Sequence, residues 1–150
     1  MRGWLVVLFM IGWAATGVGA ASALDQDGFF GEDEIRQLVS GITFEGDFTD
    51  GVKWREAYHT DGSLAYESRG SSWIGDWHAD GELFCTFYRG VIDGGCYLVR
   101  QVSNNCFYFY VAGVGLDQPS MTRSVEDRKT WYARGWRTNA ASTCPDQAVS

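Results

Sequence analysis

The chain has few of the residues on which catalytic and nucleic-acid-binding sites are usually built. Its 150 residues include only two histidines, and 19 Asp and Glu outnumber 12 Lys and Arg, so the net charge is −7. No serine stands in a Gly-x-Ser-x-Gly turn, and no phosphate-binding glycine motif occurs. Nucleic acids and anionic membranes attract basic surfaces, so the charge argues against both as partners. We expect no catalytic residues of a recognised type and no cofactor.

Long apolar runs are also scarce, and the only one stands at the N-terminus. After Met1-Arg2, residues 3–21 carry no charge, and the run closes on Ala21-Ser22-Ala23. A basic start and a small-x-small ending are typical of a cleavable secretory signal. The apolar centre, Trp4–Ala15, is shorter than the roughly 20 residues that span a bilayer. The alternative is an uncleaved N-terminal anchor.

This pattern predicts three segments and a compartment. Residues 1–23 would be the signal peptide, 24–31 a flexible N-terminal segment, and 32–150 a single domain. We therefore expect a periplasmic or secreted protein that has no membrane contact after the signal is cleaved.

The four cysteines predict two disulfides, because an even number in an exported chain is typical of a disulfide framework. A zinc site would need closely spaced cysteine pairs, which are absent here. A four-residue loop at 89–92 would place Cys85 opposite Cys96 on neighbouring strands. The remaining pair is then Cys106 with Cys144, while a turn at 103–105 does not bring Cys96 and Cys106 into register. We predict Cys85–Cys96 and Cys106–Cys144.

The periodicity predicts an all-β domain with one short N-terminal helix. In Glu32–Val39, apolar residues recur at helical spacing, acids occupy the first turn, and Gly41 follows the end. From Ile42 onward the period is two, interrupted by Asp-Gly pairs that favour tight hairpins. The expected strands are 42–45, 52–60, 63–69, 73–79, 82–88, 95–102, 106–112 and 130–136. We expect an antiparallel up-and-down meander that forms a closed or nearly closed small barrel.

Aromatic residues make up 15% of the chain and crowd these strands. A two-residue turn at 80–81 would place Trp77 opposite Phe84 and Trp73 opposite Tyr88. Trp54, Trp73 and Trp77 would then share one face, either as core or as ligand-contacting aromatics. Large side chains in a small barrel favour a filled interior over a ligand cavity. The strand 106–111 is apolar on both faces, so we expect it to be covered on both sides.

The two histidines are the remaining polar candidates. His59 and His78 each stand just before an Asp-Gly pair, with Asp61, Asp76 and Asp80 nearby. Such a group can be imagined as a metal or acid–base site, but solvated strand ends explain it as well. We therefore predict no metal site.

The order of motifs resembles a group of small exported proteobacterial proteins of unknown function. The matching features cover residues 32–112: the helix Glu34-Ile35-Arg36-Gln37-Leu38 and the strand Gly41-Ile42-Thr43, then Trp54 and Tyr58, Asp61-Gly62, Gly75-Asp76-Trp77, Asp80-Gly81, Cys85 and Cys96-Tyr97. The resemblance implies the fold and compartment and supplies no catalytic residues. Gly75-Asp76-Trp77 is also similar to the Gly-x-Trp of lipocalins and of secreted protease-inhibitor barrels. There it lies on the first strand, whereas here it falls on the fourth, which implies only a similar small barrel.

Three functional hypotheses follow, in order of preference. The first is a non-enzymatic binding or interaction module whose partner is an unknown protein or a small apolar ligand. The second is a lipocalin-like carrier with an aromatic cavity, and the third is an enzyme of unrecognised type. A cavity lined by Trp and Tyr would favour the carrier, and clustered buried histidines would favour the enzyme.

Overall fold

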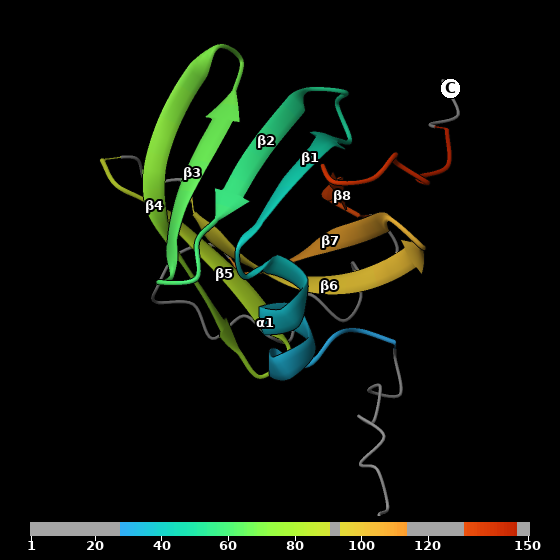
Figure 1. Cartoon of the computed structure of the whole chain (residues 1–150), viewed down its shortest axis with the longest axis horizontal. Coiled ribbons are helices and arrows are strands. Elements are labelled where there is room, and N and C mark those ends of the chain that lie inside the picture. The colour runs from blue at the N-terminus through green and yellow to red at the C-terminus, as the bar shows by residue number, and fades with distance from the viewer. Residues whose placement is uncertain (1–27, 91–93, 114–130, 147–150) are drawn as a thin grey trace, which may run out of the picture.

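The computed structural model describes residues 28–90, 94–113 and 131–146, which form one short helix and a closed barrel of eight strands (Figure 1). Strands adjacent in the chain pair antiparallel, and β1 also pairs with β8. The elements are α1 (Glu32–Val39), β1 (Ile42–Phe48), β2 (Lys53–Tyr58), β3 (Ser63–Ser68), β4 (Ser71–Asp80), β5 (Leu83–Tyr88), β6 (Gly95–Ser103), β7 (Cys106–Gly113) and β8 (Ala133–Arg137). The expected meander and its closure are confirmed.

The predicted signal peptide, 1–23, lies outside the described residues. Within the described ranges, no helix is long and apolar enough to cross a membrane.

The helix closes one end of the barrel (Figure 1). It begins after Gly31, whose backbone N–H donates to Glu34 Oε2 at 2.8 Å, and its last residues lead to Gly41 with φ +74°. Its apolar stripe, Ile35, Leu38 and Val39, is buried in the same core as residues from the barrel interior. Arg36 Nη2 donates to the carbonyl of Ala79 at 2.9 Å and ties the helix to β4. This end of the barrel is therefore filled by side chains.

Strand β7 is covered on both faces, as its composition predicted. Phe107 and Phe109 are buried in the barrel core, while Tyr110 belongs to a second buried cluster with Phe29 and Leu98. Phe29 meets the Tyr110 ring edge-on with 5.4 Å between centroids, and Arg100 Nη2 donates to the Tyr110 hydroxyl at 2.8 Å. Residues 28–31, which lie in the segment predicted to be flexible, are thus packed against the sheet.

Two disulfides fix the chain, and both predicted pairings are confirmed: Cys85–Cys96 and Cys106–Cys144. The first joins directly opposed residues of β5 and β6. The second holds the C-terminal tail beside β7, where the Asn105 side chain donates to the carbonyls of Arg137, Ala140 and Ala141. The tail is therefore attached by both a covalent and a polar contact.

The expected register of β4 and β5 is wrong by two residues. Trp77 lies opposite Thr86, not Phe84, and Tyr88 lies opposite Gly75, not Trp73. The strand continues through Asp80, which pairs with Leu83, so the two-residue turn is 81–82. A shift of two preserves the face of every side chain, and Trp77 still points inward.

Candidate functional site

A cavity of about 470 Å³ lies in the half of the barrel that α1 does not fill. The turns after β1 and β3 contribute to its wall, so it lies at the end of the barrel opposite the helix. Our expectation that side chains would fill the whole interior is therefore wrong for this half. The difference arises because α1 supplies apolar side chains to one end only.

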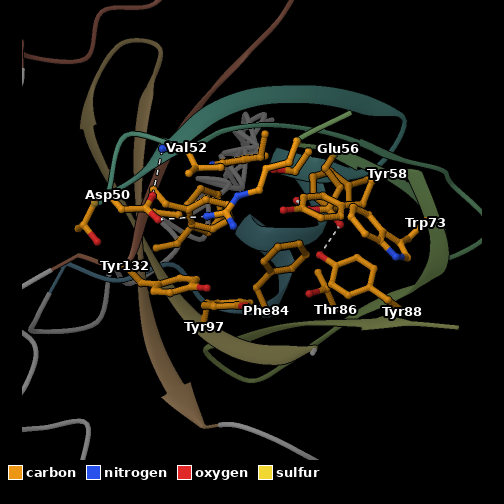
Figure 2. A pocket seen from close by; sticks show the side chains of 18 residues that line it. Asp50, Val52, Glu56, Tyr58, Trp73, Phe84, Thr86, Tyr88, Tyr97 and Tyr132 are labelled. Atoms are coloured by element: carbon orange, nitrogen blue, oxygen red, sulfur yellow. Dashed lines mark hydrogen bonds and ion pairs between the residues drawn. The ribbon is translucent and has the colours of Figure 1, made fainter. Parts of the chain in front are cut away.

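The cavity wall is mainly aromatic (Figure 2). Ten rings, from all eight strands or their ends, face the space: Phe48, Trp54, Tyr58, Tyr66, Trp73, Phe84, Tyr88, Tyr97, Phe109 and Tyr132. Tyr66 connects Trp73 and Tyr88 into one wall, with ring centroids 5.4 and 5.0 Å apart respectively. The volume and the aromatic lining are typical of small-ligand sites, which occupy roughly 300–1,000 Å³.

One carboxyl group stands among these rings. Strand β2 alternates exposed and buried positions, which places Trp54, Glu56 and Tyr58 inside the barrel. Glu56 is only 5% exposed. Its Oε2 accepts a hydrogen bond from the Tyr58 hydroxyl at 2.8 Å, and its Oε1 accepts one from the Tyr88 hydroxyl at 2.9 Å.

Burial changes the acidity of this group. It raises the pKa of Glu56 to about 7, although the hydrogen bonds from Tyr58 and Tyr88 act in the opposite direction by favouring the ionised form. Burial, and the adjacent Glu56, also raise the pKa of both tyrosines well above their ordinary value. Near neutral pH the tyrosines are therefore hydrogen-bond donors, and Glu56 exchanges between its neutral and ionised forms.

Two further polar atoms are buried in residues that line the cavity. Trp54 Nε1 is buried and makes no hydrogen bond within the described part of the chain. Thr86 Oγ1 is also buried and has no partner at full hydrogen-bond geometry there, although its interaction with the Tyr88 and Tyr97 hydroxyls opposes the rise of their pKa values. Buried polar groups are usually paired, so these two atoms are exceptions within the wall. The Trp54 indole itself is held in place by close packing on Gly46 and Gly135, where an added Cβ would come within 2.5 and 2.8 Å of the ring.

An ion pair stands at the rim of the cavity. Arg69 Nη2 lies 3.4 Å from Asp50 Oδ2 and joins the β3–β4 turn to the β1–β2 turn. Arg69 has φ +51° and precedes Gly70 with φ +75°, the backbone of a tight hairpin turn. Figure 2 shows the Asp50 carboxylate at the edge of the group of rings.

The three tryptophans predicted to share a face do all point inward, but their surroundings differ. Trp54 and Trp73 line the cavity. Trp77 lies in the filled half, where its ring packs on Tyr58 and Phe84 and its Nε1 donates to the carbonyl of His59 at 2.9 Å. A ligand in the cavity would therefore contact Trp54 and Trp73 and not Trp77.

The histidines lie outside the cavity. His59 and His78 are exposed, and His78 stacks on Phe87 with 5.4 Å between ring centroids. Two of the carboxylates near the histidines in the sequence bind other side chains: Asp61 accepts a hydrogen bond from Ser63, and Asp76 accepts one from Arg89. Across the described ranges, no three His, Cys, Asp or Glu side chains gather in a way that could hold a metal ion.

The residue that the sequence reasoning missed is Glu56. The signal was present, because Glu56 lies midway between Trp54 and Tyr58 and a period of two sends all three to the same face. An acidic residue at an inward position of an otherwise aromatic strand contradicts the rule that carboxylates stay in water. That contradiction is the sequence feature that marks the site.

The chain matches no protein-family model, and no curated protein is similar to it.

Proposed function

We propose that this protein is an exported carrier or binding protein that holds a small ligand inside its barrel. The observation that supports the proposal is the cavity of about 470 Å³, walled by aromatic rings and containing a few polar groups at defined positions. Rings supply apolar contact area, and the Glu56 carboxyl group with its tyrosine hydroxyls supplies orientation. The second of our three hypotheses is thereby preferred to a module that binds only through its outer surface.

The geometry favours binding over catalysis. The groups hydrogen-bonded to Glu56 are two tyrosine hydroxyls whose raised pKa values keep them protonated. Proton transfer in catalysis is fastest between groups with pKa values near the working pH, and only Glu56 meets that condition. His59 and His78 are exposed and are not among the residues that line the cavity, so they do not assist it.

The compartment follows from the disulfides. Two disulfides indicate a location outside the cytoplasm, where thiols are not kept reduced. Within that class we propose the periplasm or the exterior, on the basis of the N-terminal signal pattern. The resemblance to small exported proteobacterial proteins stays a hypothesis.

A titration with an uncharged environment-sensitive dye, N-phenyl-1-naphthylamine, tests the cavity. We expect saturable binding of one dye per chain, with increased fluorescence in the apolar interior. Thr86→Phe fills the cavity from β5 and should weaken binding at least tenfold, because Thr86 lines the wall and the larger ring takes up ligand space.

Ser72→Phe is the matched control, since Ser72 is exposed on β4 and faces away from the interior. It should leave dye binding unchanged. Equal binding by the wild type and the Thr86→Phe variant would place the dye elsewhere and refute the proposal.

A further inference from the structure

We infer that the cavity binds a protonated amine carried on a ring or a short apolar chain, with Glu56 as its counter-ion and the surrounding Tyr and Trp rings as its cage. This inference rests on the proposed ligand-binding function and specifies the chemical class of the ligand.

The first reason is the unbalanced charge of Glu56. Its hydrogen-bond partners in the described part of the chain are the hydroxyls of Tyr58 and Tyr88, and neither carries positive charge. An ionised carboxylate at 5% exposure without a cation is costly, because little water remains to stabilise it. A carboxylate also offers about four acceptor sites, of which the two hydroxyls use two. An ammonium group supplies both the missing charge and N–H donors for the free sites.

The second reason is the character of the wall around the carboxyl group. Figure 2 shows Tyr58, Trp73 and Tyr88 gathered beside Glu56. The faces of aromatic rings attract cations through their quadrupole, most strongly where water is excluded, and such cages are a general way to recognise ammonium groups. The apolar part of an amine would lie against Phe84 and Trp54, whose rings also line the space. The wall therefore suits a cation with an apolar body.

An anionic ligand fits the same space less well. It would place a second negative charge beside Glu56. Among the described residues, the one guanidinium that contributes to the wall is that of Arg69, which is already paired with Asp50 at the rim. The net charge of −7 also favours the approach of cations over anions. An uncharged ligand would meet the rings but leave Glu56 without a cation.

Three probes that share a phenylpropyl body and differ in the charge of the end group separate cationic, neutral and anionic ligands: 3-phenylpropylamine, 3-phenylpropan-1-ol and 3-phenylpropionate. Each is titrated into the purified disulfide-bonded protein by calorimetry near pH 8, where an alkyl amine is still protonated. We expect the amine to bind about ten to a hundred times more tightly than the alcohol, because it adds a charge-assisted hydrogen bond and a cation–π contact. The carboxylate should bind most weakly.

Glu56→Gln tests the counter-ion. The amide has nearly the same shape, so the alcohol should bind as before, whereas the amine should lose its advantage and bind within about threefold of the alcohol. Glu67→Gln is the matched control, because Glu67 is exposed on the neighbouring strand β3 and its loss changes the net charge by the same amount. It should leave the preference for the amine intact.

The outcomes distinguish the inference from the function on which it rests. Alcohol binding with no preference for the amine, or a preference for the carboxylate, would overturn the inference and leave the carrier function standing. A preference for the amine over the alcohol that persists in Glu56→Gln would overturn the role of Glu56 as the counter-ion. Failure of all three probes and of the uncharged dye would overturn both proposals. The comparison of probes on the wild-type protein decides the ligand class even if Glu56→Gln does not fold.

Discussion

The Tyr88 hydroxyl of β5 donates a hydrogen bond to Oε1 of Glu56 on β2, with 2.9 Å between the two oxygens. Strands β3 and β4 separate these two strands along the sheet, so the bond crosses the barrel interior. Tyr58 donates to the other carboxyl oxygen from the same strand as Glu56. The carboxyl group is therefore held from two sides in a fixed position at the cavity wall.

The first prediction concerns stability and pH. The folded protein holds the Glu56 proton up to a pKa of about 7, whereas an unfolded glutamate loses it near 4.5. The folded state thus binds more protons between these values, and stability falls as the pH rises through that window. Tyr58, Tyr66, Tyr88 and Tyr97, which face Glu56, have raised pKa values and do not titrate there.

Urea unfolding of the wild type and of Glu56→Gln at about pH 5 and pH 8 measures this effect. From pH 5 to pH 8, the unfolding free energy of the variant should rise relative to that of the wild type by up to about 3 kcal/mol, because the variant lacks the titrating group. A difference that does not change with pH would show that Glu56 titrates normally in the folded protein.

The second prediction concerns the hydrogen bond to Glu56. Tyr88→Phe removes a donor that stabilises the ionised carboxylate, so the pKa of Glu56 should rise above about 7. A carboxyl carbon titration by NMR measures it directly. Tyr66→Phe is the control, because this ring lines the same cavity without a hydrogen bond to Glu56. A lower or unchanged pKa in Tyr88→Phe would contradict the assigned bond.

The third prediction separates core tryptophans from cavity tryptophans. Trp77 is 7% exposed and packed in the filled half, so Trp77→Ala should cost about 3–5 kcal/mol of unfolding free energy. Trp73 is partly exposed and stacks on Tyr66 at the cavity wall, so Trp73→Ala should cost less and weaken dye binding more. Chemical denaturation and the dye titration measure the two effects. Equal losses of stability would refute this division of the interior.

The fourth prediction compares the two disulfides. Cys106–Cys144 closes a loop with a sequence separation of 38, against 11 for Cys85–Cys96. Loop-closure entropy therefore assigns about 4 kcal/mol to the first and about 3 kcal/mol to the second. Paired Cys→Ala variants, unfolded in urea, should rank in that order. The reverse ranking would mean that the Asn105 contacts hold the tail without the disulfide.

The pairings that local sequence features control could be predicted from the sequence. Cys85 lies opposite Cys96 because a short connection between neighbouring strands fixes which residues face each other. The same reasoning excluded a bridge between Cys96 and Cys106, which join other partners. The alternation of β2 likewise determined that Trp54, Glu56 and Tyr58 point inward.

One local signal was ambiguous, and the structure resolved it. The pair Asp80-Gly81 marks a turn, but a glycine with positive φ fits either central position of a tight hairpin. Gly81, with φ +58°, takes the first position, which extends β4 through Asp80 and shifts Trp77 to face Thr86. Only the pairing of the full strands selects between these registers.

The cavity and its charge were decided by the tertiary structure. The sequence determined how many large side chains point into the barrel, but not that α1 would fill one end and leave the other empty. It placed Glu56 inside, but not the Tyr88 hydroxyl that reaches it from β5. Side-chain direction follows from the local period of the backbone, whereas a void and a buried hydrogen bond depend on residues that meet only when the sheet closes.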